Sequence, residues 1–266
     1  MLAALVGRSL QRSRGLLIGV AVLLGGFQVM MTVIARELAR TNNFLQLAAL
    51  MPAAVQGMTG TLVFTTFGGF ASFGFFHPLV VLVISEAAIF LASEPSWEME
   101  AGIVDLTLAR AVPRRMVIVR TLCVACGAIA ALAILMLASM RLGLGLFAPA
   151  GAAVPPIRTT ALFAANLAAL GWWFAAAALL VATLVRRRSA ALGVSGIGAI
   201  ALYLLHLVSE MWSRAAPLRG LSPYHYYNAP ALLRGVADWP RDIAVLLVTA
   251  AIMVIAALRV YDERDL

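Results

Sequence analysis

The sequence predicts an all-α polytopic membrane protein with six transmembrane helices. Of its 266 residues, 63% are apolar and 12% are charged, and the mean hydropathy is +0.96. This composition leaves too few polar side chains to cover a water-soluble globule. Several uncharged stretches approach the about 20 residues that one membrane helix needs. The length therefore fits six spans with short loops, and it leaves no room for a sizeable soluble domain.

The first apolar run, residues 15–35, follows three arginines and is too long for the core of a signal peptide. We therefore expect it to be a retained transmembrane span. Apolar runs of comparable length predict the other five spans. These spans are expected at residues 69–93, 117–140, 159–185, 189–209 and 242–258.

The region between the first two spans is uncharged but irregular. No charged residue occurs from Thr41 to Ser85, yet Pro52, Pro78 and several glycines interrupt any single long helix. We expect the part before Gly69 to lie at the outer interface or to re-enter the membrane. Irregular backbone is tolerated at membrane depth only against protein or a water-filled cavity. Two interpretations remain open: part of a transport pathway, or an interfacial loop packed on the ends of the spans.

The arginines predict how the chain is oriented. An even number of spans places both termini on one side of the membrane. Twelve of the 20 arginines lie before the first span, in residues 94–120, in one short turn formed by Arg186, Arg187 and Arg188, and after the last span. Short, positively charged loops remain in the cytoplasm. Both termini are therefore expected in the cytoplasm, and the net charge of +8 is interpreted as a topology signal rather than as a nucleic-acid site.

Two residue types exclude several function classes. The chain contains no lysine, so it cannot form a P-loop, whose lysine contacts the phosphates of ATP. Cys123 and Cys126 are its only cysteines and lie in an apolar run, which offers neither a disulfide framework nor a four-ligand zinc site. We expect no catalytic, cofactor or metal site, and hence no enzyme activity, within this chain.

The loop after the second span is the most charged part of the expected cytoplasmic side. We expect a short amphipathic helix at residues 96–112, capped by Ser96 and ended by Pro113. Acidic residues near its start complement the helix dipole. Helical spacing separates an apolar stripe, which suits the membrane domain, from a stripe that suits a soluble partner. The second stripe consists of Glu98, Gly102 and Asp105.

An ordered pattern runs from this loop into the third span. It consists of an acid, a glycine two positions later, an apolar stretch, a proline, an arginine and a basic residue that opens the span. These are Glu100, Gly102, Leu106, Leu108, Pro113, Arg115 and Arg120. The pattern resembles that of the ABC-2 type permeases, the membrane subunits of ATP-driven exporters. Residues 1–14 also resemble the amphipathic elbow helix of that family, and residues 221–228 and 261–266 give weaker matches.

The resemblance implies a function in export. The loop would be a coupling helix that docks on a separate ABC ATPase, which binds the ATP and Mg²⁺. The complex would contain two ATPase copies and a second permease copy or paralogue in a bacterial-type inner membrane. Residues 210–241 would form a re-entrant segment near the outer gate. The coupling residues would be Glu98, Glu100, Gly102, Asp105, Leu106, Leu108, Pro113 and Arg115.

A few polar residues in or near the spans are candidates for the pathway. Glu86 is the one acid in the interior of an expected span, where a carboxylate is costly unless it is paired or hydrated. His225, Tyr226 and Tyr227 are candidate gate residues of the outer segment. The nearly charge-free spans favour an apolar or amphipathic substrate. Two alternatives remain open: an ion-coupled secondary transporter that uses Glu86, and a membrane scaffold without transport activity.

A protease-like motif in the fifth span has a simpler explanation. Ser195 lies in a Gly-x-Ser-Gly sequence, but His206 is 11 residues further along the same expected helix. That separation is about 16 Å, too far for the histidine to act as the base of the serine. We therefore expect Gly193, Gly196 and Gly198, like Gly15 and Gly19, to permit close helix packing.

Overall fold

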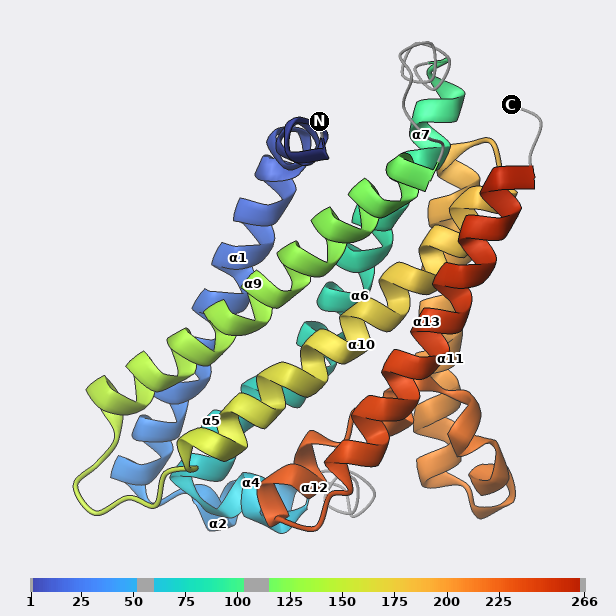
Figure 1. Ribbon diagram of the computed structural model, residues 1–266. Coiled ribbons are helices and arrows are strands. Elements are labelled where there is room, and N and C mark those ends of the chain that lie inside the picture. The colour runs from blue at the N-terminus through green and yellow to red at the C-terminus, as the bar shows by residue number, and fades with distance from the viewer. Residues whose placement is uncertain (1, 52–59, 103–114, 264–266) are drawn as a thin grey trace.

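The computed structural model describes residues 2–51, 60–102 and 115–263, and every regular element in them is a helix (Figure 1). Six segments are long and apolar enough to cross a membrane, which confirms the expectation of a multi-pass membrane protein. The segments are α1 (Leu2–Thr41), α5 to α7 (Phe67–Glu100), α9 (Arg115–Phe147), α10 (Ile157–Leu184), α11 (Arg188–Met211) and α13 (Trp239–Glu263).

The long helices share two ends, which are named here by the short helices at each. The α7 end holds α7 (Glu94–Glu100), the start of α1 and the end of α13 (Figure 1). The α12 end holds α2 (Phe44–Leu50), α4 (Thr61–Thr65) and α12 (Ala229–Arg234). The first and last helices thus begin and finish at the same end, as six crossings require.

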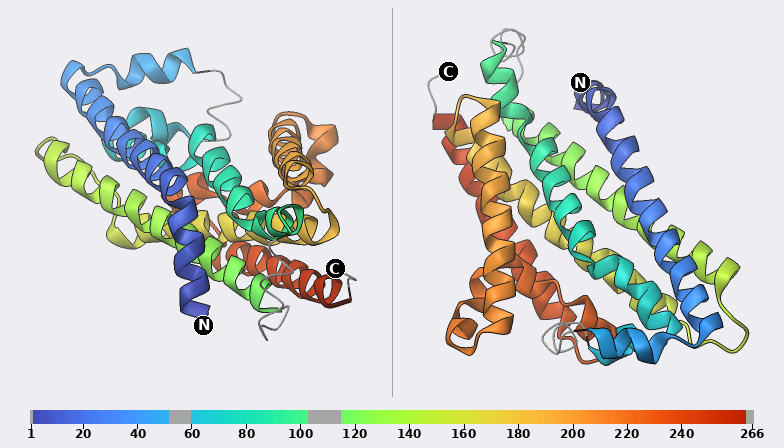
Figure 2. Two further views of the ribbon diagram at one scale, coloured as in Figure 1. Left: turned by 90° about the horizontal axis from the view of Figure 1, so that it is seen from above. Right: turned by 180° about the vertical axis from the view of Figure 1, so that it is seen from behind.

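The first helix is longer than the expected span. Residues 1–14 were expected as a separate elbow helix, but α1 continues from Leu2 to Thr41 without interruption. Figure 2 shows that its first turns run in a different direction from the rest of the helix. The expected change of direction is therefore present as a bend within one helix.

The second crossing consists of consecutive helices rather than one. Helices α5 (Phe67–Phe76) and α6 (Pro78–Ala92) meet at His77, where Pro78 cannot donate a backbone N–H and keeps its predecessor out of the helical region. The side chain of His77 caps α6, because Nδ1 accepts from the Leu79 N–H at 3.2 Å. The Tyr227 hydroxyl donates to the Phe75 carbonyl at 2.8 Å and so satisfies a carbonyl at the end of α5.

The irregular region before this crossing forms short helices at the α12 end. Helices α2 and α4 lie across the ends of the long helices (Figure 1), and residues 52–59 lie outside the described part. Thr66 caps α5 by accepting from the Gly69 N–H at 3.1 Å. A side chain at Gly69 would overlap the Leu62 carbonyl, so the α4–α5 turn depends on glycine there.

The core lies around α10, which packs against α6, α9, α11 and α13. Helix α1 lies against α5 and α9. Its Gln28 is fully buried, donates through Nε2 to the Ala71 carbonyl at 2.9 Å and fills the space beside Gly74. Thr32 occupies the space beside Gly143 in the same way. These two glycines allow α1 to approach both neighbours closely.

The glycines that were expected to pack have a different environment. A Cβ atom built at any of four of them would have no neighbour within 4 Å among the described residues: Gly15, Gly19, Gly193 and Gly198. Gly196 differs, because the Glu86 carboxylate lies 3.3 Å from its ideal Cβ position. The packing role assigned to the other four is therefore wrong within a single chain.

The segment between the last two long helices folds back along α11. It contains the 3-10 helices η1 (Ser213–Leu221) and η2 (Pro223–Tyr226), followed by α12. Ser222 Oγ donates to the Leu202 carbonyl at 2.9 Å. Leu202 precedes the last residue of α11, Met211, by nine positions, or about 14 Å along the helix axis. The chain therefore returns into the bundle before α12.

Candidate functional site

Helix α7 is attached to the bundle by buried polar contacts. It begins at Glu94, two residues before the expected start, and its N-cap is Ser93. Ser96 was expected to cap the helix, but it is buried and its Oγ donates to the Ala182 carbonyl of α10 at 3.0 Å. Ser96 therefore joins α7 to α10, and the predicted capping role is wrong.

Glu98 forms a buried, two-pronged ion pair with Arg120 of α9. Arg120 Nη1 lies 2.7 Å from Glu98 Oε1, and Nη2 lies 3.1 Å from Oε2. Both residues are at most 5% exposed. Glu98 was expected on a stripe that faces a soluble partner, and the structure corrects this expectation. A bidentate carboxylate–guanidinium pair is directional as well as strong, so it fixes α7 against the start of α9.

Glu94 adds a contact with α1. Its Oε1 accepts from Ser9 Oγ at 2.9 Å and lies 3.4 Å from Arg12 Nη1, while its Oε2 lies 3.7 Å from Arg120 Nη2. The Arg12 guanidinium also lies 3.8 Å from the centre of the Trp97 ring, a favourable cation–π geometry. Three helices, α1, α7 and α9, therefore meet at this carboxylate.

Glu100 contacts the start of α11. Its Oε2 accepts from the Arg188 backbone N–H at 2.9 Å, where a carboxylate complements the positive end of the helix dipole. The Arg188 side chain returns to the second crossing, with Nε 3.2 Å from Ser93 Oγ and the guanidinium carbon 4.3 Å from the centre of the Phe90 ring. We call the polar contacts of Glu94, Ser96, Glu98 and Glu100 the α7 cluster.

The other predicted coupling residues divide into two groups. Gly102 is exposed, has φ +65°, and a Cβ there would meet no atom within 4 Å among the described residues. Arg115 opens α9 and pairs through Nε with Asp262 of α13 at 2.7 Å. The remaining four lie outside the described part of the chain: Asp105, Leu106, Leu108 and Pro113.

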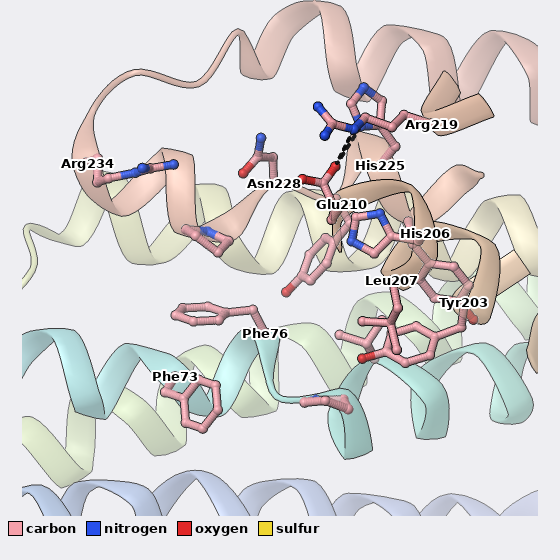
Figure 3. A pocket seen from close by; sticks show the side chains of 15 residues that line it. Phe73, Phe76, Tyr203, His206, Leu207, Glu210, Arg219, His225, Asn228 and Arg234 are labelled. Carbon is pink, nitrogen blue, oxygen red and sulfur yellow. Dashed lines mark ion pairs between the residues drawn. The ribbon is translucent and has the colours of Figure 1, made fainter. Parts of the chain in front are cut away.

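A pocket of about 400 Å³ lies at the α12 end, between α5, α6, α11 and the returning segment (Figure 3). We call it the α12 pocket. Figure 3 shows Phe73 and Phe76 on one side and the polar side chains of residues 210–234 on the other. Its volume is in the range typical of small-molecule sites.

Charged residues cluster along the polar side of the α12 pocket. Arg219 Nε lies 3.3 Å from Glu210 Oε1 and donates to the Ser209 carbonyl at 2.9 Å. His225 Nδ1 lies 4.0 Å from the same Glu210 oxygen. These contacts hold η1 and η2 against the end of α11.

The tyrosines of the returning segment occupy different environments. Tyr224 and Tyr227 are buried and line the pocket, and burial raises the pKa of both hydroxyls well above the usual range, so both remain neutral phenols. The Tyr224 hydroxyl lies 3.2 Å from Ser85 Oγ, deep in α6. Tyr226 does not line the pocket, and its hydroxyl donates to the Gly220 carbonyl at 3.1 Å. Of the three candidate gate residues, His225 and Tyr227 are at the pocket.

Glu86 lines neither site, but it lies near enough to Tyr224 of the pocket lining for its charge to help raise the pKa of the tyrosine hydroxyl. It is exposed on α6 and has no ion pair or hydrogen bond among the described residues, and its carboxylate lies against Gly196 of α11. Ser195 and His206 both belong to the continuous helix α11, as expected. Ser195 Oγ is buried, and no base among the described residues makes a hydrogen bond with it.

Several residues of these sites were not identified from the sequence. Glu94, Arg12 and Arg188 belong to the contacts around α7, and Glu210, Arg219 and Arg234 line the pocket. Their only signal was their charge in the segments that flank the spans. Among the described residues, no three His, Cys, Asp or Glu side chains gather where they could hold a metal ion. Comparison of the chain with models of known protein families and with curated proteins gives no match.

Proposed function

We propose that this chain is the membrane subunit of an ABC exporter and that α7 transmits movement from a separate ATPase. The α7 cluster is the observation that carries the proposal. Its contacts join a short helix at one end of the bundle to α1, α9, α10 and α11. A partner that displaces α7 would therefore displace the ends of four helices together.

The charge distribution supports contact with a soluble partner at this end. The arginine pattern favours a cytoplasmic location for the α7 end, where an ATPase would have access to ATP and Mg²⁺. The chain lacks the lysine of a P-loop, so nucleotide hydrolysis must occur in that partner. In this proposal two ATPase copies act on two membrane subunits, identical or paralogous, in an inner membrane.

The mechanism follows from rigid connections within the bundle. ATP binding would bring the two ATPases together, and α7 would shift with the surface to which it is docked. Because buried ion pairs tie α7 to the bundle, the shift would change the relative positions of the long helices. The pathway between the two membrane subunits would then open towards the α12 end, by alternating access.

The ion-coupled alternative receives less support from the geometry of Glu86. A proton- or cation-coupled carrier generally places interacting polar groups near the middle of the membrane. Glu86 makes no ion pair or hydrogen bond among the described residues; its carboxylate lies beside Gly196 of α11, and its charge acts on Tyr224, a neutral phenol. Charge reversal in the α7 cluster distinguishes a transporter from a scaffold. It should abolish a measurable transport activity in the first case, whereas a scaffold has no such activity to lose.

The test is whether α7 contacts the ATPase. Gly102→Trp introduces a bulky side chain where no atom of the described chain lies within 4 Å, although its φ of +65° adds strain of about 1 kcal/mol. We expect this variant to insert normally but to lose co-purification with a P-loop ATPase encoded beside it. Glu100→Arg should have the same effect, whereas Glu100→Gln retains an acceptor for the Arg188 N–H and separates the role of the charge from helix capping.

The matched control is Asp238→Arg, an exposed acid between α12 and the start of α13. It should leave both ATPase binding and substrate-stimulated ATP hydrolysis unchanged. If Gly102→Trp and Glu100→Arg bind the ATPase and couple as well as the unmodified chain, α7 is not the docking helix and the proposal fails.

A further inference from the structure

The two sides of the α12 pocket differ in chemistry. Phe73 and Phe76 of α5 provide an aromatic surface, and Tyr227 lies nearby in the lining. Figure 3 shows Asn228 and Arg234 on the opposite side. A molecule between these surfaces would contact aromatic rings along one side and polar groups along the other. The lining therefore suits an amphipathic ligand.

The charge balance of the lining identifies the sign of the ligand. Glu210, the one acid of the lining, lies 3.3 Å from Arg219, so this pair carries no net charge. Arg234 is exposed and makes no ion pair or hydrogen bond with any described residue. The unbalanced charge of the pocket is therefore positive, and it comes from a guanidinium suited to two-pronged binding of carboxylate or phosphate.

A second polar group of the lining also lacks a partner. His206 Nδ1 is buried and has no hydrogen-bond partner among the described residues. Leaving such an atom unsatisfied is costly, so it favours a ligand that also presents a hydrogen-bonding group. His206 belongs to α11 and Arg234 belongs to α12, so the two residues line different parts of the same pocket.

We infer that the α12 pocket binds an amphipathic anion. The acidic group of the ligand binds Arg234, and its apolar chain or ring packs against Phe73 and Phe76. The inference that the pocket binds such a ligand depends only on the geometry of the pocket. The further step, that this ligand is the exported substrate, rests on the function proposed above. The same chemistry is found in soluble surfactant-like acids and in the anionic lipids of the bilayer.

The probe for this inference is dodecyl phosphate. The purified chain is placed in nanodiscs of zwitterionic phosphatidylcholine, and binding of the radiolabelled probe above that of empty nanodiscs is measured by equilibrium dialysis. We expect saturable binding of dodecyl phosphate, and much weaker binding of dodecyltrimethylammonium and of inorganic phosphate. The first comparison isolates the charge, and the second isolates the apolar chain.

Substitutions at Arg234 test the assigned contact. Arg234→Gln should weaken dodecyl phosphate binding about tenfold or more, the loss expected for one charge-assisted contact. Arg234→Lys retains the charge and should restore most of the affinity. Arg214→Gln removes an exposed arginine of the same returning segment that does not line the pocket, and it should have no effect. Equal melting temperatures of the variants exclude misfolding.

The inference is overturned if dodecyltrimethylammonium binds as tightly as dodecyl phosphate, or if Arg234→Gln leaves the affinity within twofold. If dodecyl phosphate binds as expected, nanodiscs with added phosphatidylglycerol identify the source of the ligand. Competition by this lipid assigns the site to bilayer lipid, and undiminished binding assigns it to a soluble anion. No ATPase is present in these measurements, so a failure of the exporter proposal would leave their outcome unchanged.

Discussion

Removing the Glu98 carboxylate should destabilise the chain more than any exposed ion-pair substitution. In Glu98→Ala, the guanidinium of Arg120, a residue that is 3% exposed in the unmodified chain, loses both of its short contacts, at 2.7 and 3.1 Å. Breaking a buried ion pair by removing one partner costs about 3–5 kcal/mol. Glu94 Oε2 remains 3.7 Å from Arg120 Nη2 and compensates in part. We therefore expect a loss of about 3 kcal/mol in the free energy of unfolding.

The double variant Glu98→Leu/Arg120→Met provides the critical comparison. Replacing both members of a buried pair by apolar residues of similar size is often neutral or stabilising. Arg120 Nε makes no hydrogen bond in the described part of the chain, and this reduces the contribution of the pair to the free energy of unfolding. The double variant should therefore be more stable than Glu98→Ala, and under the proposed function it should uncouple ATP hydrolysis from transport.

The measurement is reversible unfolding in mixed micelles with increasing fractions of SDS, followed by circular dichroism. Glu37→Ala is the control, because Glu37 pairs with Arg40 at 3.1 Å while both side chains are more than half exposed. That substitution should change stability by less than about 1 kcal/mol. A loss below about 1 kcal/mol for Glu98→Ala, or an equal loss in the double variant, would refute the argument that this pair fixes α7.

Three further outcomes are expected. Tyr227→Phe should lower stability by about 1–3 kcal/mol in the same unfolding assay, because it leaves the Phe75 carbonyl at the end of α5 without its donor; an unchanged midpoint would contradict this. Ser195→Ala should leave expression and transport unchanged and stability equal or higher, because the buried hydroxyl has no partner among the described residues; loss of function in a folded variant would indicate catalysis. In a background without the native cysteines, Ser189→Cys should resist an impermeant thiol reagent in intact cells and Asp238→Cys should react, since Ser189 is exposed at the start of α11 and Asp238 is exposed between α12 and α13; the reverse labelling would invert the topology.

Local sequence properties were enough to predict the class of fold. Hydropathy depends on the residues of one segment, so the six apolar helices and the interruption near Pro78 could be recognised without knowledge of their neighbours. The even number of crossings and the acidic character of the loop after the second crossing could also be recognised from local sequence. Helix length was less predictable, since α1 and α9 extend well beyond the apolar runs.

Only the tertiary structure decided which polar residues meet. Glu98 and Arg120 are 22 residues apart, Glu100 and Arg188 are 88 apart, and the Tyr224 hydroxyl reaches across 139 residues to α6. Each contact depends on the rotation of two helices about their axes. Glu98 was therefore expected at the surface, and the α12 pocket, which four separate segments line, had no signature in the sequence.

The glycines show why the packed face of a membrane helix is difficult to predict from its sequence. In water, the buried face of a helix is apolar and the outer face is polar, so periodicity reveals the inner side. In lipid both faces are apolar, and only close contact between backbones distinguishes them. Gly193 and Gly198 in α11 therefore gave the same signal as Gly74 and Gly143, yet only the latter two lie against side chains of α1. The sequence by itself determined which segments enter the membrane, and packing between helices decided which of their faces meet.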